Sequence, residues 1–204
     1  MLKQKRRTSK IHTIPAPMRG WNVKDPLPDM PQTDAVILDN CFCRPSDIQI
    51  RKGYTSWATG LAGNVETIFE YAPPTGTAEI LAASNNSGAC QIYDISASGA
   101  VGAAVVSGLT SAQIKTASFT NSGGSFLHCV NGADSLRLYD GTTWHAVTDV
   151  SAPYAITGVA TTSLIDVIIH KRRVWFVQKY TMSCWYLAGD AISGAATKYD
   201  FGPI

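Results

Sequence analysis

The sequence has few charged residues and no long hydrophobic run, and each absence argues against a class of protein. Charged residues make up 16% of the 204 residues, against about a quarter in typical soluble domains. No stretch approaches the roughly 18 apolar residues that a membrane-spanning helix needs. The basic N-terminus lacks the apolar segment of a secretory signal. A hydrophobic content of 45% still allows a substantial buried core, so we expect the chain to fold.

Cysteine is scarce, and its spacing fits neither a disulfide framework nor a zinc site. The five cysteines are an odd number, whereas small disulfide-stapled domains carry dense, even sets. Cys41 and Cys43 are separated by one residue, and no second pair follows at zinc-finger spacing. We therefore expect packed, reduced thiols in a protein made in the cytosol, with no metal and no cofactor.

The motifs of common catalytic sites are also missing. The sequence contains no GxSxG, HExxH, GxxxxGK[ST] or GxGxxG. His128 and Cys129 are adjacent in an apolar strand, so their side chains should point to opposite faces. Aspartates such as Asp134 and Asp140 occur at turns, where carboxylates commonly bind the local backbone. These observations predict a protein that is not an enzyme.

A pattern of about 46 residues occurs three times. Each copy has an apolar run, a polar turn, a second run with a tyrosine, and a turn rich in Gly, Ser and Thr. The copies span Leu81–Val101, Leu127–Val147 and Trp175–Ala195. Their tyrosines, 46 and 47 residues apart, are Tyr93, Tyr139 and Tyr186. A period of roughly 40–50 residues built from short strands is typical of propeller blades or a similar β-array.

Alternating apolar and polar residues predict the individual strands. One strand precedes each copy, at Val65–Tyr71, Ile114–Thr120 and Ser163–His170. In the second unit we expect strands at Phe126–Val130 and Leu136–Tyr139. Asn131-Gly132 should form the turn between them, because both residues tolerate positive φ.

Two further segments complete this description of local structure. Asp47–Tyr54 alternates like a half-buried strand and is interrupted by Gly53. Helix is almost absent, and Thr110–Lys115 is the one stretch compatible with a single helical turn.

The basic residues are unevenly distributed. Five of the 17 lie within the first ten positions, and the remaining 12 face 15 acidic residues. Any contact with phosphate or an acidic partner would therefore lie in the tail, or at a hairpin tip formed by residues 170–173. The alternatives are a solvated leader and an ordinary exposed tip. The candidate contact residues are Lys3, Lys5, Arg6, Arg7, Lys10, Lys171, Arg172 and Arg173.

Prolines separate an arm from the repeats. Five prolines lie between Pro15 and Pro31, and proline lacks the donor that a sheet ladder needs. Residues 1–30 are therefore predicted to form an extended arm, suited to lie across a neighbouring subunit. Residues 31–204 are predicted to form an all-β, propeller-like array of short antiparallel sheets.

The array is expected to be incomplete. Two or three units cannot close a propeller, which has roughly four to eight blades. The last unit would leave apolar surface and an open strand edge. We expect that the protein continues past residue 204, the alternative being that neighbouring subunits cover the open end.

Several stretches of the chain carry a family resemblance. They are PAPMRGWNVKDPLPDMP (Pro15–Pro31), DAVILDN (Asp34–Asn40), IRKGYTSWATGL (Ile50–Leu61), VETIFEY (Val65–Tyr71), VNGADSLRLYDGTTW (Val130–Trp144) and YDFGPI (Tyr199–Ile204). Together they resemble the N-terminal part of the tail nozzle proteins, or tail tubular protein B-like proteins, of short-tailed bacteriophages and related prophages. The sequence departs from the family pattern at Cys41 and Cys43, where the family has Trp and Pro, and by stopping where its relatives continue.

The resemblance implies a structural virion protein, located in the tail and synthesised in the cytoplasm of a bacterial host. Subunits of such a nozzle form a homo-oligomeric ring below the portal and adaptor, carry tail fibres or spikes, and line the conduit through which double-stranded DNA leaves. A propeller-like β domain is part of what the family implies. In this interpretation the basic tail and the proline arm contact the adaptor or an adjacent subunit.

Other functions remain open from the sequence. A head-completion plug that stabilises packaged DNA would belong to the same virion class. A surface carbohydrate-binding β-propeller would expose aromatics such as Trp57, Trp144 or Trp185 at loop positions. A hydrolase on a propeller scaffold would need two convergent carboxylates, and the sequence offers no pair to nominate.

Overall fold

The computed structural model describes residues 13–202, and contacts divide this part of the chain into two compact units. The first unit ends at Thr55 and the second begins at Ser56. The domain change predicted after residue 30 thus falls inside the first unit. The basic residues of the predicted tail, Lys3 to Lys10, lie outside the described residues.

The first unit consists of short strands separated by turns. β1 (Gly20–Trp21) pairs in parallel with β2 (Asp34–Ala35). A 3-10 turn (Leu27–Asp29) lies between these two strands in the sequence and contains a proline. β3 (Cys41–Cys43) pairs antiparallel with β4 (Ile48–Ile50).

The strand predicted over residues 47–54 is therefore confirmed only for its first half. β4 ends at Ile50, and the following Arg51, Lys52 and Gly53 have no strand structure and are exposed. Arg51, Lys52 and Gly53 have no apolar side chain to bury, so the alternation of apolar and polar residues stops and the strand ends at Ile50.

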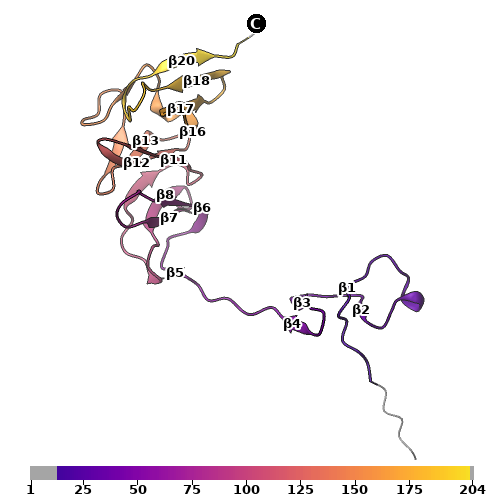
Figure 1. The fold of residues 1–204 in the computed structure, drawn as a ribbon. Coiled ribbons are helices and arrows are strands. Elements are labelled where there is room, and N and C mark those ends of the chain that lie inside the picture. Colours follow the sequence, from indigo (N-terminus) through magenta and orange to yellow (C-terminus); the bar gives the residue numbers. More distant parts are fainter. Residues whose placement is uncertain (1–12, 203–204) are drawn as a thin grey trace, which may run out of the picture. The chain divides into compact units, whose positions relative to one another are not determined.

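The second unit contains three four-stranded antiparallel sheets that follow one another along the chain (Figure 1). The first sheet consists of β6 (Asn64–Tyr71), β7 (Glu79–Asn86), β8 (Ala89–Asp94) and β10 (Val106–Leu109). The second consists of β11 (Lys115–Asn121), β12 (Gly124–Val130), β13 (Leu136–Tyr139) and β14 (Trp144–Val147). The third consists of β16 (Leu164–His170), β17 (Arg173–Gln178), β18 (Ser183–Tyr186) and β20 (Thr197–Asp200). The expected all-β fold with several small antiparallel sheets is confirmed, and within residues 13–202 the sheets do not close into a ring.

Short parallel pairs accompany the first and third sheets. β5 (Ala58–Thr59), which precedes the first sheet, pairs with β9 (Gly99–Ala100) in the connection between β8 and β10. β15 (Ile156–Thr157), which precedes the third sheet, pairs in the same way with β19 (Gly194–Ala195). The second sheet has a tight turn between β13 and β14 and no equivalent connection. In the first and third sheets, the segment that enters the sheet is thus paired with the connection that precedes the last strand.

Two apolar cores lie between the sheets. Leu81 of the first sheet and Leu127 of the second belong to one core. Phe126 of the second sheet and Phe176 of the third belong to the other. Neighbouring residues of a strand point to opposite faces, so β12 serves both cores. Each such buried side chain contributes about 1.5–3 kcal/mol, and this packing holds successive sheets together.

The repeated tyrosines all lie in the third strand of their sheets, as the period predicts. Tyr93 lies in β8, Tyr139 in β13 and Tyr186 in β18. Tyr139 packs in the core that the second sheet shares with the first. Tyr186, in contrast, belongs to neither core between the sheets.

A shift of one residue explains the different position of Tyr186. Tyr139 is the cross-strand partner of Leu127, and the corresponding partner of Phe176 is Trp185. Trp185 accordingly packs against the core between the second and third sheets. Because side chains alternate along a strand, an offset of one residue moves the tyrosine to the opposite face.

The turn predicted at Asn131-Gly132 is confirmed in part. Leu136–Tyr139 is a strand with the expected bounds, and a turn precedes it. Only Gly132 of that turn has positive φ, at 70°, because the Asn131 side chain accepts the N–H of Ala133 and of Asp134. A Cβ at Gly132 would lie 2.6 Å from a side-chain methyl of Ile165.

Helical structure does not occur where it was allowed. Thr110–Lys115 has no helical turn, and the 3-10 turn of the second unit is instead at Thr161–Ser163. The N–H and hydroxyl of Thr110 bind the Asp134 carboxylate, which holds this stretch extended. Within residues 13–202, no helix has the length and hydropathy to span a membrane.

Candidate functional site

The hairpin tip predicted at residues 170–173 is confirmed, and its backbone is unusual. His170 pairs with Arg173, so Lys171 and Arg172 form a two-residue turn between β16 and β17. Both have positive φ, 47° and 57°, as in the hairpin turns that favour Asn-Gly. The left-handed region costs residues other than glycine roughly 1–2 kcal/mol each, so other contacts must stabilise this turn.

Arg172 provides such contacts. Its guanidinium lies 2.6 Å from the Asp190 carboxylate, and the Asp190 N–H donates to the Arg172 carbonyl at 2.9 Å. The Asn121 amide donates to the Asp190 carbonyl at 2.8 Å. The tip is therefore tied to a loop of the third sheet and to the hairpin end of the second. Pairing with Asp190 also makes Arg172 a weaker candidate for phosphate binding.

The other two basic residues of the tip differ in what they offer a partner. The Arg173 guanidinium carbon lies 5.1 Å from the centre of the Tyr186 ring, a cation–π contact. Lys171 is exposed at the turn itself. The structure thus brings together three of the eight predicted contact residues, and the other five lie outside the described residues.

One face of the third sheet carries apolar and aromatic side chains that no other sheet of the second unit covers. Its apolar residues lie in two cross-strand rows and a C-terminal extension: Ile168, Trp175 and Tyr186, then Val177, Cys184 and Tyr199, then Phe201; the polar residues Thr197 and Asp166 occupy the ends of the two rows. We call this surface the outer face of the third sheet. Ile168 is 62% exposed and Tyr199 is 51% exposed. None of its residues belongs to the cores between the sheets.

The sequence predicted apolar surface on the last unit but did not identify the residues that form it, although the signal was present. β17 reads RVWFVQ and is apolar on both faces, which is typical of a strand that is covered on both sides. Its Val174 and Phe176 are fully buried against the second sheet. Trp175 and Val177 face the other way and are only half-buried.

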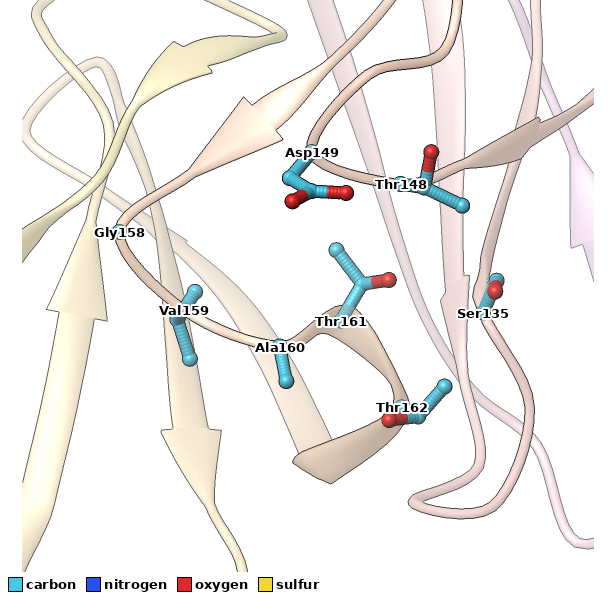
Figure 2. Close-up of a pocket in the computed structure, with 8 residues that line it drawn as sticks. All are labelled: Ser135, Thr148, Asp149, Gly158, Val159, Ala160, Thr161 and Thr162. Atoms are coloured by element: carbon cyan, nitrogen blue, oxygen red, sulfur yellow. The ribbon is translucent and has the colours of Figure 1, made fainter.

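A polar pocket lies between loops at one end of the second and third sheets (Figure 2). Its lining residues are Ser135, Thr148, Asp149, Gly158, Val159, Ala160, Thr161 and Thr162. The Thr161 hydroxyl donates to the Val147 carbonyl at 2.7 Å, which ties the 3-10 turn to β14. The pocket offers hydroxyls and one carboxylate, and its lining has no histidine, cysteine or lysine to act as base beside a hydroxyl.

His128 and Cys129 point to opposite faces of β12, as predicted. His128 is fully buried between the second and third sheets, where Nε2 lies 3.0 Å from the Ile192 carbonyl oxygen. Burial lowers the pKa of His128 to about 4. Cys129 lies in the other core, and burial raises the pKa of its thiol. The two side chains cannot act at one site.

Turn aspartates bind nearby backbone and side-chain donors, as predicted. The Asp134 carboxylate accepts the Thr110 N–H at 2.8 Å and the Asn131 amide at 2.7 Å. Burial favours a higher pKa for Asp134, but the hydrogen bonds from Asn131 and Thr110 outweigh it, so the pKa is lowered. The Asp140 carboxylate accepts the Thr143 N–H at 2.7 Å and contacts His145 Nε2 at 2.9 Å. These carboxylates serve structure in the turns.

The aromatics that a carbohydrate-binding surface would need lie mostly inside the protein. Trp144 stacks on Tyr139, with ring centres 4.8 Å apart. Trp185 is half-buried against the core between the second and third sheets, and its indole N–H donates to Gln178. Trp57 is 57% exposed, and its indole N–H donates to the Ile95 carbonyl.

The cysteines are unpaired, and Cys41 and Cys43 are half-buried in the first unit. The Cys43 thiol lies 3.5 Å from the Pro17 carbonyl oxygen. In the part of the chain that the structure describes, no group of three or more His, Cys, Asp or Glu side chains could hold a metal ion.

The chain matches no protein-family model, no curated protein and no solved structure.

Proposed function

We propose that this chain is a structural component of the virion of a short-tailed bacteriophage, a subunit of the tail nozzle that assembles into a ring. One observation carries the proposal. Three four-stranded sheets pack in series, and the last of them presents an apolar, aromatic outer face. Such a face is costly in water and marks an interaction surface. A protein whose function is assembly needs this kind of surface.

The finer architecture belongs to the same proposal. Each four-stranded meander corresponds to one blade of a propeller-like array, and the parallel pairs β5–β9 and β15–β19 join the segment entering a blade to the connection before its last strand. Propellers contain roughly four to eight blades. In the assembled ring, further sheets complete the array, and the blades form the wall of the nozzle.

The work of the subunit is mechanical. It joins the adaptor to the distal tail, holds fibres or spikes, and provides the conduit for double-stranded DNA during ejection. The basic tail and the proline arm contact the adaptor or an adjacent subunit. The Arg172–Asp190 pair supports this division of roles, because it leaves Arg172 less available to bind the phosphate backbone.

Deletion of residues 1–30 tests the proposal. In a phage or prophage that encodes this chain, the shortened protein should leave the second unit folded and should fail to enter particles. Immunogold labelling of wild-type particles should place the protein in the tail. Normally tailed particles assembled with the shortened protein would overturn the role of the arm, and an unlabelled tail would overturn the assignment.

A second variant separates charge from the arm itself. Replacing Lys3, Lys5, Arg6, Arg7 and Lys10 with serine removes the five positive charges and retains every proline. Loss of incorporation in this variant assigns the contact to charge, and normal incorporation assigns it to the proline segment. The same labelling separates a nozzle from a head-completion plug, because a plug is labelled at the head–tail junction of particles that lack a tail.

A further inference from the structure

Inside this chain, each sheet that is followed by another has a defined partner for one of its faces. The first sheet places Phe69 and Leu81 against the second sheet. The second sheet places Phe126 and Leu138 against the third. The equivalent side of the third sheet is its outer face. Two internal examples therefore show what kind of surface covers such a face. In both, it is a face of the next four-stranded sheet, the one directed towards the preceding sheet.

The first sheet offers a surface of that kind. Val65, Ile68 and Ile80 lie on its side opposite the second sheet and are 45%, 63% and 42% exposed. A shallow hollow is lined in part by Ile68, Glu70 and Ile80. Val65 owes its exposure to the irregular register between Val65 and Thr67, where the buried alternation predicted for this strand is interrupted.

The remaining part of that side is already covered. Ala82 and Tyr93 are buried by residues 58–62 and 101–104. The open part therefore follows β6 and the adjoining edge of β7. Between the second and third sheets, the first strands make the main contact, with β11 lying against β16. The exposed strip is where a preceding sheet would dock.

Charge favours the same pairing. Glu70 lies near the end of β6, beside the turn that leads to β7. The corresponding end of the third sheet carries His170 and Arg173, which share the side of Ile168 and Trp175. Sheets that pack with their first strands aligned bring these ends together, so the Glu70 carboxylate of one molecule meets the Arg173 guanidinium of another.

We propose that the outer face of the third sheet binds the exposed β6–β7 strip of the first sheet in a second copy of this chain. The contact is head-to-tail, because each molecule uses the outer face of its third sheet to bind one neighbour and the strip of its first sheet to bind another. Repetition of this contact produces a ring or an open filament. This inference rests on the homo-oligomeric assembly in the proposed function and names the surface that mediates it. Its test uses the purified chain and needs no virion.

Two single variants block opposite faces. Ile168→Glu places a carboxylate on the outer face of the third sheet, and Ile68→Glu places one on the strip, so the two blocked faces also repel each other. Both sites are more than half exposed, so each variant should fold. Wild-type chain should show a molar mass that rises with concentration beyond a dimer in sedimentation velocity. Each variant alone should associate at least about tenfold more weakly, because an unpaired charge in an apolar interface is strongly disfavoured.

Mixing the two variants gives the sharper result. Each retains the face that the other has lost, so an equal mixture should form a one-to-one dimer and nothing larger. Val150→Glu, which changes an 84% exposed side chain in a loop, is the matched control and should assemble like the wild type. A wild-type chain that stays monomeric at all concentrations, or variants that assemble like the wild type, would overturn the proposal.

A second measurement keeps the test independent of the variants' folding. A photo-crosslinking amino acid at position 168 of the wild-type chain should crosslink to peptides of β6 and β7 from another molecule. Crosslinks between two copies of β16, or to another protein only, would overturn the head-to-tail contact. If the protein self-associates through these faces but never enters particles, the nozzle assignment is wrong. The head-to-tail contact itself would still be supported.

Discussion

The imidazole of His128 joins the second sheet to the third: Nε2 lies 3.0 Å from the carbonyl oxygen of Ile192. The ring is fully buried, and its centre is 6.1 Å from that of Phe176. His128 Nδ1 is buried and has no hydrogen-bond partner among the described residues. Protonation would therefore place a positive charge in an apolar core.

We predict that the stability of the second unit falls as the pH is lowered from about 7 towards 4. The folded pKa of His128, about 4, lies below the ordinary value of 6.5, so the unfolded chain takes up the proton first. The stabilising contribution is complete above the unfolded pKa and is lost as the pH falls through this window. Its size is about 3 kcal/mol, measurable by urea unfolding at several pH values. His128→Leu should flatten the profile in this range, and an unchanged slope would contradict the assignment.

Gly63 cannot be replaced without strain, because a Cβ there would lie 2.1 Å from the backbone oxygen of Asn85 and its φ is +76°. Gly63→Ala should lower the free energy of unfolding of the second unit by at least about 2 kcal/mol. Gly189→Ala is the matched control, since no atom lies within 4 Å of the added Cβ and its φ is unrestrictive. Urea unfolding compares the two, and equal effects would show that the β6 entry adapts freely.

Asp134 ties the segment before β11 to the turn after β12, through Thr110 and Asn131. Asp134→Ala leaves those donors without their acceptor and should cost about 2 kcal/mol. Asp149→Ala, in an exposed loop position, should change stability by less than about 0.5 kcal/mol. Thermal unfolding followed by circular dichroism gives both values. A similar small effect at both positions would show that water replaces the Asp134 carboxylate without loss.

The tip of the third sheet should tolerate a better turn sequence. Lys171→Asn with Arg172→Gly removes two unfavourable left-handed residues, at the expense of an exposed ion pair worth under about 1 kcal/mol. The double variant should gain about 1 kcal/mol in free energy of unfolding. Arg172→Ala keeps the strained φ, loses the pair with Asp190, and should be less stable than the wild type. A double variant weaker than Arg172→Ala would show that Arg172 contributes more than charge.

Local sequence patterns predicted much of the strand content. The alternation over Val65–Tyr71 is confirmed from Thr67 onward, with Phe69 and Tyr71 buried and Glu70 exposed. Leu136–Tyr139 forms a strand with the predicted bounds. The hairpin at residues 170–173 also occurs as expected, because two apolar runs flank a polar turn. Such features depend on neighbours in the sequence, and short-range steric and hydrophobic preferences suffice to predict them.

The candidate sites were predicted less well, since they depend on contacts between distant residues. The pairing of Arg172 with Asp190 joins a hairpin to a loop that follows β18. The outer face of the third sheet exists because β16, β17, β18 and β20 align their side chains across four strands. An alternating pattern shows that a strand has two faces, and it does not show which neighbour covers each one.

The 46-residue period and the β-rich composition are properties of the sequence by itself, and they determined a chain of similar antiparallel units. Tertiary structure alone decided that Trp185, and not Tyr186, occupies the place of Tyr139. The reason is that hydrogen-bond register is set when strands pair, and a change of one residue in register exchanges the buried and exposed sides. That choice turned Tyr186 outward, onto the outer face of the third sheet.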